Sequence, residues 1–432
     1  MDLSGIPYAE LRADRDARLV DSSEVDRLLS TLDSVGATDL VVLSHGWNND
    51  EAEARRFYAA LAARMVEVRP RVAGLARADR RLALLGVLWP SKKFAESELI
   101  PGGAAAVPAG PSDAELRREL AALADLVGRP VPADALAAVS HVDERASARR
   151  ALADAVRELV EPAIDPDDEE TPPKLFAVDG EELYQRFARP TLVLPPRRAT
   201  GGAADVRAAA TGGAAGFRLL GGLRNAARNL LNFGTYYAMK DRAGRIGFEA
   251  VAPVLGRLAR DRSGVRLHLA GHSFGGRVVA AAATGAGGPS VPIASLTLLQ
   301  AAFSHYGFAS GWEPGRDGLF RRCLGSGRVG GPVLVTHTGN DKAVGIAYAL
   351  ASRAAGQVAA AVGDAQDRYG GIGRNGAQQT PEAVQRELLD VGADYRLAPG
   401  KVHNLLADRF VSGHSDVTDP QVAYALLTGV AS

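Results

Sequence analysis

The sequence predicts an α/β protein with a mostly parallel central sheet, flanked by helices and carrying a long, mainly helical insertion. Short, continuously apolar runs alternate with helical patterns, as in parallel sheets whose strands are buried on both faces. One of these runs leads through a sharp glycine-rich turn into a helix, with Ser273 at the apex. Residues 96–239 interrupt the alternation and are too many for a loop, which indicates an inserted unit.

The first 95 residues alternate between helical and strand patterns. Leu28, Leu29 and Leu32 recur at helical spacing, and the apolar strand that follows them ends in His45-Gly46-Trp47. The expected elements are a helix over 21–32, a strand over 40–43, a helix over 51–68 and a strand over 81–89. A strand, a helix and a second strand in this order predict a right-handed parallel crossover.

Residues 96–239 are rich in Ala, Gly and Pro and contain few strand patterns. We expect a helical cap here, between two parts of an α/β core that covers 1–95 and 240–432. The predicted cap helices lie at 114–126, 133–159 and 216–232. Asp165–Pro173 is expected to be an exposed, mobile turn, in which the acidic run Asp165–Glu170 is solvated.

The last part of the chain resumes the alternation of helices and strands. After a helix over 246–258 and the strand, turn and helix around Ser273, apolar runs predict three more strands. These strands are expected at 293–299, 332–336 and 395–397, with helices near 344–355 and 420–427. Gly325–Gly330 matches a dinucleotide-binding pattern by letter only, because it precedes a strand and opens no helix.

The turn Gly271-His272-Ser273-Phe274-Gly275-Gly276 is the centre of the functional prediction. A serine on so tight a turn is strained, and side chains at the flanking glycines would collide with the neighbouring strand and helix. The helix behind it offers N-terminal N–H groups to a negative charge that forms beside the serine. The alternative is a glycine-rich turn that only tightens the packing of strand and helix.

A serine nucleophile needs a histidine base, and the histidine needs a carboxylate that orients it. Asp341 follows a later strand, and His414 lies in a loop after the last strand, just before the terminal helix. The order Ser, Asp, His is the one that a nucleophile turn of this kind requires. The open alternatives are Asp408 and Asp416 for the acid and His403 for the base.

The oxyanion formed on a carbonyl substrate needs two N–H donors. The N–H of Phe274 is the first candidate, and the N–H of Trp47, with Gly46 as the alternative, is the second. Four further residues are candidates for substrate binding. They are His45, His272, Trp89 and Tyr236, with a packing role as the alternative for His45 and Trp89 and a turn-shaping role for His272.

Together, these motifs resemble α/β-hydrolases of the serine esterase and lipase kind. The resemblance covers residues 35–95 and 245–432 and depends on His45-Gly46-Trp47, Trp89-Pro90, the Ser273 turn, Asn340-Asp341 and Gly413–Asp416. It implies Ser273 as nucleophile, His414 as base and Asp341 as acid, with no metal or organic cofactor. The expected substrate is a small ester or acyl compound with a hydrophobic acyl or aryl group.

The composition excludes some partners. Fifty basic and fifty acidic residues cancel, so nothing suggests a nucleic-acid surface, and no apolar run is long enough to insert stably in a membrane. A polar N-terminus and a single cysteine, Cys323, predict a cytoplasmic protein. Two other functions stay open: acyl transfer by the same three residues, and a non-catalytic binding or assembly role for the fold.

Overall fold

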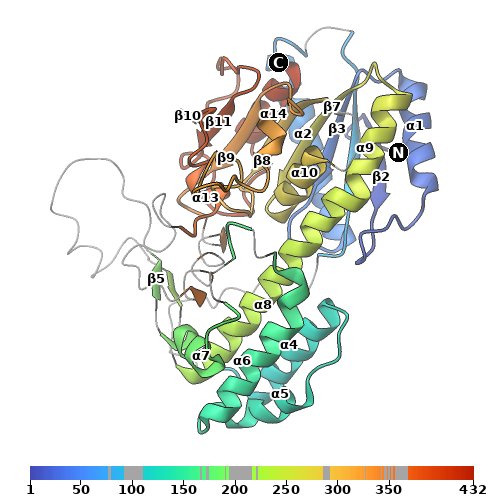
Figure 1. The fold of residues 1–432 in the computed structure, drawn as a ribbon. Coiled ribbons are helices and arrows are strands. Elements are labelled where there is room, and N and C mark those ends of the chain that lie inside the picture. Colours follow the sequence, from blue (N-terminus) through green and yellow to red (C-terminus); the bar gives the residue numbers. More distant parts are fainter. Residues whose placement is uncertain are drawn as a thin grey trace, which may run out of the picture. The chain divides into compact units, whose positions relative to one another are not determined.

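The computed structural model divides the chain into two compact units, which are described separately (Figure 1). The sheet unit is Met1–Lys92, Arg242–Asp341 and Gly371–Ser432, and the helical unit is Lys93–Asp241 and Lys342–Gly370. The described residues are 1–75, 79–91, 110–165, 168–171, 175–189, 191–193, 217–219, 222–285, 292–325, 327–341, 343–344, 348, 351, 354–355 and 368–432. Most of the helix expected over 344–355 therefore lies outside them.

The sheet unit contains a nine-stranded sheet in the order β1-β2-β4-β3-β7-β8-β9-β11-β10. All neighbouring strands are parallel except β1, which pairs antiparallel with β2. The strands are β1 Asp2–Leu3, β2 Ile6–Arg12, β3 Asp39–Ser44, β4 Leu82–Leu88, β7 Arg266–His272, β8 Ile293–Leu299, β9 Val333–His337, β10 Ala383–Glu387 and β11 Val402–Leu406. The predicted α/β class with a mostly parallel sheet is confirmed.

Helices pack along this sheet (Figure 1). One large core joins strand residues to α2 (Glu51–Val68) and α14 (Pro420–Ala431). The helix α10 (Phe274–Thr284) packs against β3, β7 and β8. The other helices of eight residues or more are α1 Ser23–Val35 and α9 Ala252–Asp261, which a π-helical stretch over Ile246–Val251 precedes.

Local sequence explains where α2 begins. The Asp50 carboxylate accepts the N–H of Glu53 at 2.8 Å, and the Glu53 carboxylate accepts the N–H of Asp50 at 2.8 Å. This reciprocal cap satisfies two N–H groups that the first helical turn leaves open. Tyr58, Leu61 and Met65 then recur on one buried face. The Tyr58 hydroxyl accepts the N–H of His45 at 2.9 Å, which ties α2 to the residue that follows β3, where the candidate site begins.

The helical unit consists mainly of five helices among its described residues. They are α4 Asp113–Leu126, α5 Ala133–Ala138, α6 Ala146–Val160, α7 Gly180–Ala188 and α8 Leu223–Arg245, the last of which belongs to this unit up to Asp241. A short antiparallel pair, β5 Thr191–Val193 and β6 Phe217–Leu219, was not predicted. The expectation of helix from 216 is therefore wrong at its start.

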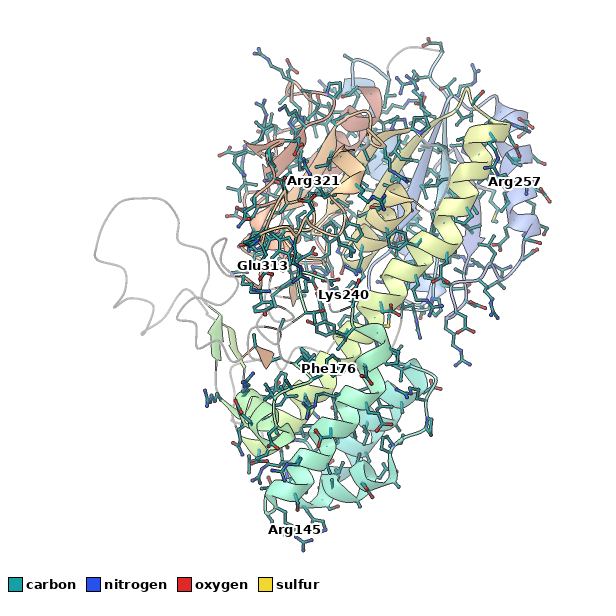
Figure 2. The ribbon with its side chains drawn as sticks, in the orientation of Figure 1. Arg145, Phe176, Lys240, Arg257, Glu313 and Arg321 are labelled. Atoms are coloured by element: carbon teal, nitrogen blue, oxygen red, sulfur yellow. The ribbon has the colours of Figure 1, made fainter. Side chains whose placement is uncertain are left out.

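The prediction that Asp165–Glu170 is an exposed turn is wrong for its second half. Asp168, Glu169 and Glu170 are no more than 3% exposed. The Nζ of Lys240 lies 2.7 Å from Asp168 Oδ1 and 2.9 Å from Glu170 Oε2 (Figure 2 labels Lys240). The hydroxyls of three tyrosines also donate to Glu170, and they belong to Tyr236, Tyr237 and Tyr348. Burial is possible because a cation and several donors replace the lost water.

The last predicted strand, Tyr395–Leu397, is also wrong. These residues form no strand, and the final strand is β11 instead. Tyr395 is 1% exposed because its ring packs in the core and its hydroxyl accepts the N–H of Leu389 at 2.8 Å. The strand β11 was missed because it contains Asn404, whose buried amide bonds to the backbone of Ala377 at both ends.

No helix in the described part of the chain is long and apolar enough to cross a membrane.

Candidate active site

Ser273 stands between β7 and α10 with φ 56° and ψ −127°. A non-glycine residue in such a region carries strain of about 1–3 kcal/mol, which surrounding bonds must hold. The Ser273 N–H donates to Leu299 O at 3.1 Å, and the Ser273 carbonyl accepts from Gly276 and Ala302 at 2.9 and 3.0 Å. These bonds tie the turn to the end of β8 and fix the direction of the serine side chain.

Two glycines of the turn leave no room for a side chain. A β-carbon at Gly271 would lie 2.2 Å from Gly275 O, and one at Gly275 would lie 2.2 Å from Ser44 O. Strand β7, helix α10 and the end of β3 therefore approach one another more closely than any other residue would allow. This is the steric requirement that the sequence predicted for the turn.

The structure brings the three predicted residues of the site together. The Oγ of Ser273 lies 2.9 Å from Nε2 of His414, and Nδ1 of His414 lies 2.7 Å from Oδ2 of Asp341. Because the carboxylate accepts, Nδ1 carries the proton, and Nε2 is left to accept from the serine hydroxyl. Ser273 and Asp341 are 5% and 0% exposed, and the His414 side chain is 20% exposed.

The loop that carries Asp341 is held from two sides. Asp408 Oδ1 accepts from the Thr338 hydroxyl at 2.7 Å and from the Gly339 N–H at 2.9 Å. The Nη1 of Arg374 donates to the carbonyls of Gly339 and Asp341 at 2.9 and 3.0 Å. Arg374 is 8% exposed, and burial lowers the pKa of its guanidinium. The sequence analysis did not identify Arg374, which lies in the short helix α13 (Ile372–Asn375).

The alternative acids and base have other partners. Asp408 binds the acid loop, and Asp416 Oδ2 accepts from the N–H and hydroxyl of Ser412 at 2.9 and 2.6 Å. His403 lies within β11, and its Nε2 accepts the N–H of Ala398 at 3.1 Å. Asp408 and Asp416 therefore support the loops that carry the acid and the base.

The loop after β3 comes close to the serine. A β-carbon at Gly46 would lie 2.6 Å from Cβ of Ser273. The Gly46 carbonyl accepts from His45 Nδ1 at 2.9 Å, Asn49 Nδ2 at 3.2 Å and Ser91 Oγ at 2.9 Å. In a planar trans peptide the next N–H, that of Trp47, points the opposite way. Three donors thus fix the direction of the predicted oxyanion donor, and Asn49 and Ser91 were missed.

His45 and Trp89 form the support of this loop. Their rings stack at 5.4 Å, the Trp89 N–H donates to His45 Nε2 at 3.2 Å, and the indole N–H donates to His45 O at 3.2 Å. Burial lowers the pKa of His45 to about 4, so the ring is neutral near pH 7. Both ring nitrogens of His45 form hydrogen bonds within the protein, which favours the packing role that the sequence left open.

His272, Phe274 and Tyr236, the remaining aromatic residues of the predicted site, have different surroundings. His272 is 8% exposed, and its Nε2 lies 2.8 Å from the backbone oxygen of His414. The ring of Phe274, whose N–H is the other predicted oxyanion donor, lies 5.8 Å from the ring of Trp47. Tyr236 belongs to the helical unit, where its hydroxyl donates to Glu170 at 2.9 Å.

Within the described residues, no group of three or more His, Cys, Asp or Glu side chains could hold a metal ion. Comparisons with protein-family models, curated proteins and solved structures found no match. The functional argument therefore depends on the geometry of the site.

Proposed function

We propose that this protein is a serine hydrolase that cleaves a carboxylic ester through an acyl-enzyme intermediate. One observation carries the proposal: Ser273 Oγ, the His414 ring and the Asp341 carboxylate form a continuous hydrogen-bonded chain, with links of 2.9 and 2.7 Å. The three residues come from positions far apart in the sequence. The strained backbone at the serine makes a chance arrangement a poor explanation.

The geometry supports a two-step reaction. Ser273 Oγ attacks the ester carbonyl carbon while His414 Nε2 takes the hydroxyl proton, and Asp341 stabilises the imidazolium. The tetrahedral intermediate collapses, the bond to the alcohol oxygen breaks, and His414 returns the proton to that oxygen. Water then loses a proton to His414 and attacks the acyl carbon. The second tetrahedral intermediate collapses, the bond to Ser273 Oγ breaks, and His414 returns the proton to Oγ, which releases the carboxylic acid.

The oxyanion of each intermediate needs fixed donors. The Trp47 N–H is fixed in direction by the bonds to the Gly46 carbonyl, and Phe274 is the first residue of α10. A helix N-terminus adds positive potential beside the serine. These features support Trp47 and Phe274 as the donors, an arrangement whose removal in other enzymes costs about 10²–10³ in kcat.

The fold proposal follows from the same residues. We infer an α/β-hydrolase core in the sheet unit, with nucleophile, acid and base after β7, β9 and β11, in the chain order that this fold uses. The main segment of the helical unit, Lys93–Asp241, is inserted between β4 and β7, and its second segment, Lys342–Gly370, lies between β9 and β10. Two insertions into the sheet unit support the proposal of a cap.

Ester hydrolysis tests the proposal. We expect wild-type protein to hydrolyse p-nitrophenyl esters of some acyl length with a burst of p-nitrophenol, because acylation precedes slower release of the acid. Ser273→Ala should lose the burst and the turnover. A panel of acyl lengths that gives no activity with wild-type protein, or equal activity with Ser273→Ala, would contradict the proposed function.

A further inference from the structure

Two consecutive residues of the turn bind the same residue in another part of the chain. Ser273 Oγ lies 2.9 Å from the His414 ring, and His272 Nε2 lies 2.8 Å from the His414 backbone oxygen. A carbonyl oxygen can only accept, so the His272 ring must carry its proton at Nε2. His414 is thus held at its ring by Ser273 and Asp341 and at its backbone by His272.

The His272 ring is enclosed by parts of the site itself. It lies 4.9 Å from the His414 ring and 5.6 Å from the Phe57 ring, measured between ring centres. Its Nδ1 lies 3.2 Å from where a β-carbon at Gly46 would stand. The ring therefore touches the base, the helix α2 and the oxyanion loop at once, and it has little freedom to rotate.

The electrostatics suit a ring beside the base. Burial, followed by the positive charge of a protonated His414, lowers the pKa of His272 to about 3. His272 therefore stays neutral at any pH at which the base works. A neutral neighbour adds no charge repulsion when His414 becomes an imidazolium during catalysis.

The base needs such support because its loop has no regular structure. His414 lies between β11 and α14, in a stretch where Ser412 and Asp416 bond to each other across the loop. Asp341 holds the His414 ring at Nδ1, and His272 holds the His414 backbone oxygen. Displacement of a reacting group by about 1 Å can cost 10²-fold in rate.

We propose that His272 is a positioning residue, whose Nε2–H bond to the His414 carbonyl sets the place of the base relative to Ser273. This inference rests on the proposed hydrolase function and gives the ring a role other than the substrate contact that the sequence predicted. It implies that the residue before the nucleophile fixes the base, so that one turn determines both ends of the proton transfer.

Three substitutions separate positioning from packing. His272→Gln places an amide N–H near the position of Nε2, His272→Asn places one near Nδ1, and His272→Leu fills the space without a donor. With p-nitrophenyl acetate, we expect His272→Gln to keep kcat within about fivefold of wild type. His272→Asn and His272→Leu should lower kcat about 10²-fold with little change in KM. Thermal unfolding of each variant checks that the fold is intact.

The leaving group gives a second readout that a merely structural role would not move. A misplaced His414 is a poor proton donor, so His272→Leu should lose more activity on an alkyl ester than on a p-nitrophenyl ester, whose leaving group needs no proton. Equal losses for Gln, Asn and Leu, losses that follow only the Tm, or no loss for Leu would overturn the inference.

The hydrogen bond itself can be tested without activity. In ¹⁵N-histidine NMR spectra of the full chain, assigned with His272→Gln, His272 should remain the neutral Nε2–H tautomer from pH 5 to 8. An Nδ1–H tautomer, or titration near pH 6.5, would overturn the inference. If wild-type protein shows the expected tautomer but hydrolyses no ester, the bond stands, while the proposed function and the positioning role both fail.

Discussion

Gly46 and Ser273 approach so closely that a β-carbon on the glycine would lie 2.6 Å from Cβ of the serine. The same β-carbon would lie 3.1 Å from the carbonyl oxygen of His272. Neither neighbour is a flexible chain end, so the oxyanion loop and the nucleophile turn would have to move apart. This contact joins the two parts of the sequence that were predicted to supply the oxyanion donors.

Gly46→Ala should therefore lower kcat/KM by about 10²–10³, the range expected when an oxyanion donor is displaced. Gly264→Ala is the matched control, because a β-carbon there meets nothing within 4 Å. Steady-state kinetics on a p-nitrophenyl ester measure both variants. Normal kcat/KM in Gly46→Ala would contradict the proposed role of this loop.

Asp341→Asn should lower kcat by about 10⁴, because an amide can donate to Nδ1 and so favour the wrong tautomer of His414. Asp408→Asn is the comparison: Asp408 accepts from Thr338 and Gly339 in the acid loop. We expect its loss to be much smaller. If Asp408→Asn were the more damaging change, the acid would have been assigned to the wrong carboxylate.

Arg374→Met should impair both stability and turnover. The carbonyls of Gly339 and Asp341 would lose a charged donor, at about 1–3 kcal/mol for buried groups left unpaired. Arg374→Lys keeps a donor and should retain more of both properties. Thermal unfolding and kcat, measured together, test this; an unchanged Tm and kcat in Arg374→Met would show that the loop needs no such support.

The buried charges of the helical unit predict a pH effect. Burial, and next the charge of Asp168, raises the pKa of Glu169 from 4.5 to about 8. The folded state therefore binds a proton that the unfolded chain has released. The stability that this proton confers is complete below pH 4.5 and is lost as the pH rises through about 8. Glu169→Gln should flatten this decline.

Hydrogen exchange in α8, compared at pH 5 and pH 8, measures the effect of Glu169. The same decline in stability with pH in wild-type protein and Glu169→Gln would show that another group is responsible.

Lys240→Met should increase exchange in α8 at both pH values, because Asp168 and Glu170 would lose their cation. Such a change costs about 3–5 kcal/mol in buried pairs.

Strands β3, β4, β7, β8 and β9 and the turn at Ser273 could be predicted because each depends on local sequence, whereas β1, β2, β10 and β11 were not predicted. Leu40–Leu43 is continuously apolar and 0–1% exposed in β3, and the glycines around Ser273 admit one backbone path. Asp341 and His414 were found because parallel strands bring their carboxyl ends to one edge of the sheet. For these residues, the sequence pattern and the topology of a parallel sheet lead to the same prediction.

Other features depend on contacts between distant residues. Nothing near Asp168–Glu170 in the sequence indicates that Lys240 supplies the opposite charge. Arg374 and Ser91 act through backbone carbonyls, which leave no residue-type signal. The prediction of a strand at Tyr395 was wrong because a buried tyrosine gives the same sequence pattern in a loop as in a strand. Only the structure shows that its hydroxyl binds the N–H of Leu389.

Covalent labelling tests the central claim most directly. A fluorophosphonate probe reacts with a serine only when a base activates it, so intact-mass measurement and peptide mapping should find one probe adduct per chain, on Ser273. Ser273→Ala should show no adduct, and His414→Ala should react far more slowly. No adduct on folded wild-type protein, or equal labelling of Ser273→Ala, would contradict the account.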